Sequence, residues 1–191
     1  MRKLKTIEMH RLTVQQFKEA PKLPLVVVLD DVRSLHNVGA VFRSCDAFRV
    51  EAVYLCGITA TPPSPEIHKT ALGAEDSVDW QYFERAEEAV QQLRREGYFV
   101  YAIEQVEGSE KLQALQLQPA QKYAVVLGNE VKGVKQSTVD RCNGSLEIPQ
   151  LGTKHSLNVS VTAGIVVWEF AKQLLFALDG TEMTNKNFWR H

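Results

Sequence analysis

The chain has 191 residues, 45 % hydrophobic and 24 % charged, with a formal net charge of −1 at pH 7, which suits one globular domain with a buried core and gives no overall sign of a nucleic-acid partner. No stretch approaches the roughly 20 apolar residues that span a bilayer, and the N-terminus lacks the apolar core of a secretory signal. Three cysteines without CxxC spacing argue against a disulfide framework or a zinc site, so we expect a soluble cytoplasmic protein that needs no metal and no membrane.

The N-terminal segment is locally basic. Within residues 1–22, two acidic residues accompany six basic ones: Arg2, Lys3, Lys5, Arg11, Lys18 and Lys22. A basic arm of this kind could contact phosphates, and an ordinary solvated helix with outward lysines and arginines explains the same charges. Composition leaves both interpretations open.

Short apolar runs alternate with helical patterns along the rest of the chain. Continuous or β-branched runs predict strands at 25–29, 50–55, 77–83, 98–103, 123–127 and 146–148. Helical spacing predicts helices at 37–48, at 86–96 with Gly97 as a C-cap, and from about 156 to 178, with a weak helix in the loop 104–118. The segment TPPSPE after the second strand is predicted to be a proline-rich turn.

This order predicts an α/β fold with a largely parallel sheet and helices on both faces. We expect a short basic extension at 1–24, one domain at 25–180 and a tail at 181–191. In open sheets of this kind the ligand lies beyond the carboxyl ends of the strands. The loops that follow LVVVL, YAVVL and LEI are therefore the places to look for chemistry.

The first of these loops leads into the helix predicted at 37–48. Asn37 is a candidate N-cap, and Gly39 would allow a close approach to the first turn. Arg43 lies six residues further on and could reach the same cleft. Taken alone, this stretch is better explained as a plain capped helix with a surface arginine.

The second and third loops also combine glycines with polar side chains. Gly128 and Gly133 enclose Glu130 in a tight loop whose backbone could meet a ligand directly, although a solvated glutamate is the simpler explanation. In the third loop a Pro/Gly-rich turn precedes Ser156, a candidate N-cap. Asn158 has poor helix propensity for its place in the first helical turn.

Together and in this order, the loops resemble the three sequence motifs of the SpoU/TrmH-like RNA methyltransferases, a branch of the SPOUT class. NVGAVFR resembles the first motif, LGNEVKGV the second and IPQLGTKHSLNVSVTAGI the third. The resemblance covers residues 25–175, nearly the whole chain. Each fragment is weak by itself, and their order on an α/β background makes the match specific.

The resemblance implies a SPOUT fold in which the C-terminal part of a parallel sheet is threaded into a deep trefoil knot. It implies S-adenosyl-L-methionine (AdoMet) as cofactor, with contacts that map by motif to Ile103, Gly128, Ile148 and Leu157. Family members work as homodimers, and the apolar face of residues 159–176 suits either a core or a dimer surface.

The implied reaction is attack of a ribose 2′-hydroxyl on the AdoMet methyl group. Arg43 matches an arginine that has been proposed as the base, but a guanidinium is always protonated in proteins, so orienting a phosphate is an equally physical role. Asn37 and Asn158 would hold the substrate and the first loop, and Glu130 would fix Arg43 or another donor. Ser156 would bind near the transfer site.

Two other functions predict different sequence features. A dinucleotide enzyme should show GxGxxG after the first strand, and LVVVLDDVRSLHNVGA has a single glycine, too late. A non-catalytic RNA-binding relative should have lost Asn37, Arg43, Glu130 or Asn158, and all four are present. We expect an RNA substrate, with tRNA favoured over rRNA and guanosine as a possible base. The tail NKNFWRH could bind RNA or be disordered.

Overall fold

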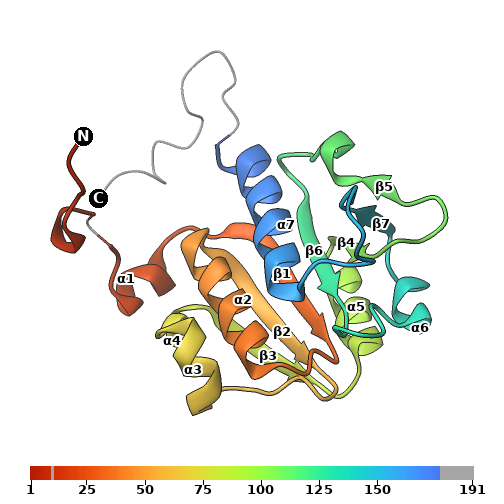
Figure 1. Cartoon of the computed structure of the whole chain (residues 1–191), viewed down its shortest axis with the longest axis horizontal. Helices are drawn as coiled ribbons and strands as arrows, with labels where there is room; N and C mark the ends of the chain where they lie inside the picture. The colour runs from red at the N-terminus through yellow and green to blue at the C-terminus, as the bar shows by residue number, and fades with distance from the viewer. Residues whose placement is uncertain (10, 177–191) are drawn as a thin grey trace.

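The computed structural model describes residues 1–9 and 11–176. Its strands are all parallel and, with the helices between them, follow the alternating order expected of an α/β fold (Figure 1). The strands are β1 Leu23–Asp30, β2 Val50–Cys56, β3 Asp79–Phe83, β4 Tyr98–Ile103, β5 Glu110–Lys111, β6 Lys122–Leu127 and β7 Gly144–Glu147. The α-helices are α1 Val14–Glu19, α2 Leu35–Ala47, α3 Pro65–Ala71, α4 Ala74–Ser77, α5 Ala86–Arg95, α6 Gln136–Val139 and α7 Val159–Leu174. Short 3₁₀ helices occupy Thr6–Met9 and Leu112–Ala114.

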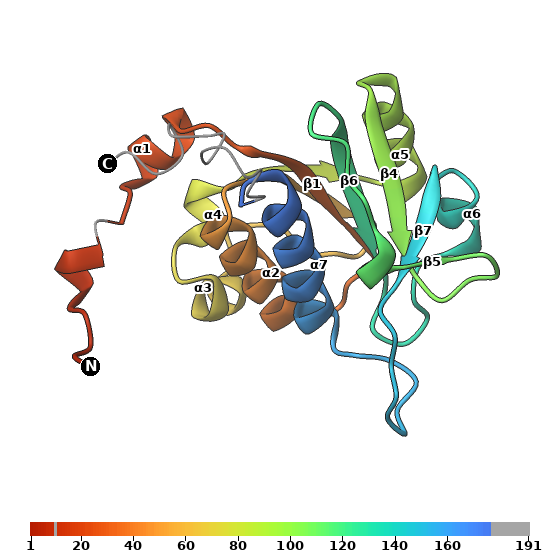
Figure 2. The same cartoon turned by 90° about the horizontal axis from the view of Figure 1, so that it is seen from above.

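The strands form one seven-stranded sheet in the order β3-β2-β1-β6-β4-β7-β5. β6 therefore lies in the middle of the sheet between β1 and β4, and Val27 pairs in register with Val125. Because the strands are parallel, the loops after β1, β4, β6 and β7 open at one edge. The loop between β7 and α7 projects from that edge (Figure 2).

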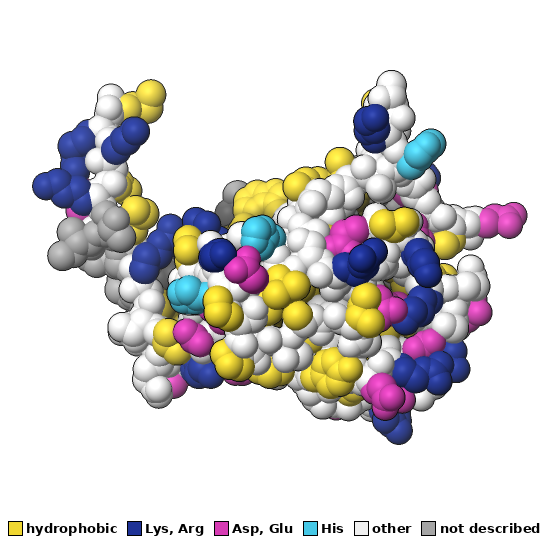
Figure 3. Space-filling model, turned by 60° about the horizontal axis from the view of Figure 1, so that its bottom comes forward, with side chains coloured by type: hydrophobic (Ala, Val, Ile, Leu, Met, Phe, Trp, Pro, Cys, Tyr) yellow, Lys and Arg dark blue, Asp and Glu magenta, His cyan; other side chains and the backbone are white. Residues whose placement is uncertain are grey.

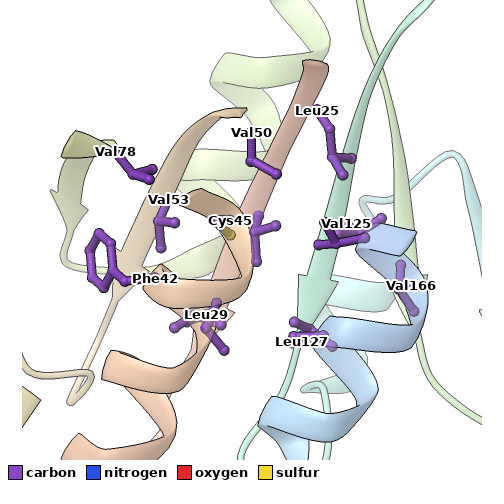
Figure 4. Packing of buried hydrophobic residues seen from close by; sticks show 14 of the residues in the cluster. Leu25, Leu29, Phe42, Cys45, Val50, Val53, Val78, Val125, Leu127 and Val166 are labelled. Atoms are coloured by element: carbon purple, nitrogen blue, oxygen red, sulfur yellow. The ribbon is translucent and has the colours of Figure 1, made fainter. Parts of the chain in front are cut away.

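Helices cover both faces of the sheet, as expected for a buried parallel sheet (Figure 2). On the face of α2 and α7, Leu29 of β1 and Leu127 of β6 pack beneath Phe42 and Val166, and all four side chains are fully buried or nearly so (Figure 4). α5 covers the opposite face through a second cluster that includes Leu93. The two clusters hold the strands rigidly, which fixes the loops at their ends.

The predicted α/β class, parallel sheet and two helical layers are confirmed. The threading of a knot stays a prediction of the family resemblance, because strand order and pairing do not describe it. No helix in residues 1–9 and 11–176 is both long and apolar enough to cross a membrane.

One predicted segment was correct only in part, and another was wrong. Regular structure stops after β2 and is absent over residues 57–64, as the proline-rich turn predicts, but α3 begins within TPPSPE: Ser64 caps it and Pro65 occupies its first turn, where a missing N–H costs nothing. The weak helix predicted at 104–118 is instead the short strand β5 followed by a 3₁₀ turn. That turn buries Leu112 and Leu115, whose spacing of three resembles a helical pattern.

Two predicted helix starts were also wrong. Ser34, not Asn37, caps α2, and its Oγ accepts the N–H of Asn37 at 3.3 Å. Asn158, not Ser156, caps α7, which ends at Leu174. Ser, Asn and Asp are nearly equivalent as caps, so local propensity does not choose between them. The tail at 181–191 and Gly180 lie outside the described residues.

Candidate functional site

The loops after β4, β6 and β7 enclose a cleft of about 580 Å³. Seven of the nine residues predicted to bind the cofactor or to act in catalysis line it: Ile103, Gly128, Glu130, Ile148, Ser156, Leu157 and Asn158. Thus all four positions expected to contact a cofactor share one cavity, although they come from segments far apart in the chain. A cavity of this size matches those that hold small-molecule ligands.

Glu130 ties the second loop to the first. Its carboxylate accepts the backbone N–H groups of Arg33 and Ser34, each at 3.0 Å, and the side-chain amide of Asn37 at 2.9 Å. Partial burial on its own would raise the pKa of Glu130, but these donors outweigh it and lower the pKa below the ordinary value. Glu130 is therefore an anion at neutral pH that holds the first loop, and it does not pair with Arg43.

Asn37 and Asn158 join the first loop to the third. The side-chain amide of Asn158 donates to Oδ1 of Asn37 at 3.1 Å, and its own Oδ1 caps α7 by accepting the N–H of Ser160 at 2.9 Å. Through Glu130 and this pair, all three loops belong to one hydrogen-bond network. The capping role also explains why a residue of poor helix propensity stands at position 158.

The second loop is closed by its own backbone. Asn129 and Gly133 exchange two backbone hydrogen bonds of 3.0 and 2.9 Å, and Asn129 also donates its side-chain amide to the carbonyl of Asp31 at 2.8 Å. A Cβ on Gly128 would lie 2.1 Å from backbone atoms of Gly133 and Val134. Gly128 is thus required for loop closure, and it also lines the cleft in which the sequence predicts a backbone approach to a ligand.

Glu104 is a cleft residue that the sequence analysis missed. It follows the last residue of β4, and its Oε2 accepts the N–H of Val134 at 2.9 Å. Next to it, Gln105 donates its side-chain amide to the carbonyl of His155 in the third loop at 3.1 Å. The position of Glu104 directly after a predicted strand was a signal that could have found it.

Asp30 is the last residue of β1, and Asp31 follows it. Lys135 lies 2.6 Å from Asp31 Oδ2 and 3.4 Å from Asp30 Oδ1, so one ammonium joins β1 to the segment after the second loop. Burial raises the pKa of Asp30. Burial acts in the same direction on Asp31, but the hydrogen bonds from Lys135 and from the N–H of Ile58 outweigh it and lower the pKa.

Arg43 does not line this cleft, contrary to the expectation from spacing. Six residues of α-helix turn through about 240° beyond one full revolution, which places Arg43 on a different face of α2 from Asn37. Its exposed side chain lines a second groove of about 530 Å³ together with Phe48, Lys69 and Thr70. Within one chain, Arg43 therefore lies apart from the hydrogen-bond network around Glu130.

Charge at the carboxyl edge of the sheet is mixed. Figure 3, which brings this side of the molecule forward, shows basic, acidic and histidine side chains interspersed with hydrophobic ones. Among the described residues, no group of three or more His, Cys, Asp or Glu side chains could hold a metal ion. The cleft itself is lined by Glu104, Glu130 and Glu147 and also by Lys132 and His155.

Comparison with known proteins identifies a family. The profile of the SpoU rRNA Methylase family matches residues 24–168. The 23S rRNA (guanosine-2'-O-)-methyltransferase RlmB of Coxiella burnetii is 33% identical over 162 residues, which are 85% of this chain and 63% of that protein. The chain thus spans about three fifths of the length of the first curated relatives that it matches.

A second relative matches over nearly its whole length. The tRNA (guanosine(18)-2'-O)-methyltransferase of Thermus thermophilus is 29% identical over 170 residues, 89% of this chain and 86% of that protein. Among solved structures, an AdoMet-bound rRNA methyltransferase from Sinorhizobium meliloti is 25% identical, with a TM-score of 0.73 over 82% of this chain and 62% of that one. These similarities agree with the parallel sheet and its loops.

Proposed function

The chain belongs to the SpoU rRNA Methylase family, and we propose that it is an enzyme that transfers a methyl group from AdoMet to a ribose 2′-hydroxyl of RNA. The observation that carries this proposal is the network in which Glu130, Asn37 and Asn158 join the three motif loops around one cleft. A dinucleotide enzyme or a structural protein would not require that arrangement at these positions.

The cleft fits AdoMet in size and in chemistry. Ile103, Ile148 and Leu157 supply apolar wall for a nucleoside, and carboxylates from Glu104 and Glu130 suit a ligand that carries positive charge. When bound, AdoMet supplies a methyl group already activated by its sulfonium. No metal is needed for such a transfer, and the protein's task is to align the hydroxyl and exclude water.

The protein's own residues divide that task. Asn37 and Asn158 keep the first and third loops in register, and the Glu130 carboxylate holds the first loop against the second. Arg43 is available to orient an RNA phosphate, because its guanidinium is exposed and forms no hydrogen bond or ion pair with other described residues. A permanently protonated guanidinium is better suited to that role than to removing a proton.

We propose rRNA as the first candidate substrate, in place of the tRNA favoured by the sequence alone. This choice is supported by the names of three curated relatives that are 33–35% identical, which are 23S rRNA guanosine 2'-O-methyltransferases. tRNA stays the second candidate, because the Thermus thermophilus tRNA enzyme is matched over 86% of its length. Guanosine is the proposed base in both cases.

Methyl transfer to unmodified RNA tests the proposal. The purified chain with labelled AdoMet is expected to methylate 23S rRNA transcripts, and nucleoside mass spectrometry is expected to show 2′-O-methylguanosine. Incorporation into tRNA alone would move the assignment to the second candidate. RNA binding without transfer, despite measurable AdoMet binding, would support the non-catalytic alternative and contradict the enzymatic one.

We also propose that the protein acts as a homodimer through α7. Val161, Ile165 and Trp168 form an exposed apolar stripe on this helix, 51%, 38% and 48% exposed. Their spacing of four and three residues puts them on one face. Trp168 packs against Phe48, with ring centroids 5.7 Å apart, and Phe48 also lines the Arg43 groove. A second copy on this stripe would therefore lie beside Arg43.

The expected result of Ile165→Glu is a monomer, because a dimer would bury the new carboxylate without a partner. Light scattering during size-exclusion chromatography measures the mass. Ile58→Glu makes the same exchange at a residue 65% exposed and away from α7, and this control should stay dimeric. A monomeric wild type, or an unchanged mass for Ile165→Glu, would contradict the proposed interface.

A further inference from the structure

The carboxylate of Glu104 fits closely beneath the second loop. Oε2 accepts the N–H of Val134 and Oε1 accepts the N–H of Gln105, both at 2.9 Å. Gly133 has a φ of 67°, and a Cβ at this position would lie 2.1 Å from Glu104 Oε2. The glycine is therefore needed both for its backbone conformation and for the carboxylate beside it.

The backbone of Glu104 is anchored as well. Its N–H donates to the carbonyl of Leu146 at 3.1 Å, and its carbonyl accepts the hydroxyl of Ser145 at 3.0 Å. These bonds join the end of β4 to β7. Glu104 is one of the residues that line the cleft, and because both its backbone and its carboxylate are held, its charge has a fixed position.

That charge has no cationic partner. None of the ion pairs among the described residues includes Glu104. Glu147 in the same cleft wall differs, because its carboxylate lies 2.6 Å from the ammonium of Lys111 and accepts the hydroxyl of Ser109 at 2.7 Å. Backbone donors orient Glu104 but do not cancel its charge, so its field acts on whatever occupies the cleft.

Building on the proposed function, we infer that Glu104 is a positioning residue that makes the cleft prefer the cationic cofactor to its neutral product. AdoMet carries a positive sulfonium. When the ribose 2′-oxygen forms its bond to the methyl carbon, the S–CH3 bond breaks, the sulfur keeps the bonding electron pair as a neutral thioether, and the hydroxyl proton passes to solvent water. The carboxylate attracts the cation more strongly than the thioether, so the same residue favours cofactor binding and product release.

Binding measurements without RNA test this inference. Isothermal titration calorimetry would compare AdoMet, S-adenosylhomocysteine and sinefungin, an analogue with an ammonium in place of the sulfonium. Glu104→Gln is expected to lower the affinity for both cationic ligands about tenfold and the affinity for S-adenosylhomocysteine less than about threefold, because Coulomb attraction requires charge on both partners. A residue with only a structural role would weaken all three ligands equally.

Two further variants make the result interpretable. Glu107→Gln removes the same charge from an exposed residue of the same loop that does not line the cleft, and it should leave all three affinities unchanged. Glu104→Asp keeps the charge but shortens the reach to Val134. It should lower the affinity for all three ligands while keeping the preference for the cationic ones. This variant therefore still tests the inference if Glu104→Gln fails to fold.

The outcomes separate the two proposals. The inference would be overturned if Glu104→Gln lost affinity equally for the three ligands or lost none, or if Glu104→Asp lost the preference for cations. Each of these outcomes would leave the proposed function standing. A wild-type chain that binds neither AdoMet nor S-adenosylhomocysteine would overturn the proposed function itself, and the inference with it.

Discussion

Replacing Arg43 with alanine is expected to reduce methyl transfer at least about 100-fold, a loss of roughly 2.7 kcal/mol of transition-state stabilisation. AdoMet affinity should stay within about twofold of the wild-type value, because Arg43 lines the groove beside α3 and not the cleft of Glu130. Single-turnover transfer to RNA and calorimetric titration of AdoMet measure the two quantities separately. Loss of AdoMet binding would contradict a substrate-side role.

The conservative variant distinguishes charge from geometry. Arg43→Lys keeps a cation but loses the planar pair of donors that a phosphate can accept, so it should recover only part of the activity. Arg95→Ala removes an exposed arginine from α5 on the opposite face of the sheet and serves as the control. Full activity in Arg43→Lys would indicate that charge alone matters, and a comparable loss in Arg95→Ala would indicate a general effect of net charge.

Replacing Gly128 with alanine is expected to lower the free energy of unfolding by about 2–3 kcal/mol and to weaken AdoMet binding at least about tenfold. The added Cβ would lie 2.1 Å from backbone atoms of Gly133 and Val134, so the loop has to move. Glu130 and Asn129 of the second loop form hydrogen bonds to the first loop, so a displacement of the second loop would also change the cleft. Urea denaturation and calorimetry measure both effects.

Gly152→Ala is the matched control. Gly152 belongs to the third loop, and a Cβ there would have no heavy atom within 4 Å. The free energy of unfolding of the Gly152→Ala variant should differ from that of the wild type by less than about 0.5 kcal/mol, as for other surface substitutions. If Gly128→Ala retained wild-type stability and AdoMet affinity, the second loop would be more adaptable than its close backbone contacts indicate.

The fold class and the location of the site could be predicted from sequence because both depend on local patterns. Strands buried on both faces of a parallel sheet need continuous apolar runs, and residues 25–29 and 123–127 provide them. Parallel strands end at one edge, so the loops that follow them must meet there. For this reason the loops after residues 123–127 and 146–148 could be expected at one edge, and the family resemblance then placed Gly128 and Ile148 in a shared cofactor site.

The hydrogen-bond partners within the site could not be predicted in this way. Glu130 was expected to fix Arg43 or another donor, and the structure gives it the N–H groups of Arg33 and Ser34, nearly a hundred residues away in the chain. Asn37 and Asn158 were singled out individually, but their mutual hydrogen bond spans 121 residues. Such contacts depend on how separate loops pack, which no local pattern describes.

Hydrophobic periodicity and turn chemistry act over a few residues, so they specify the buried strands, the helices between them and the polar loops at their ends. Tertiary packing sets the order of the strands, the place of β6 between β1 and β4, the contact of Glu104 with Val134 and the separation of Arg43 from the cleft. Each of these depends on which segments become neighbours when the sheet and its helices close around the shared core.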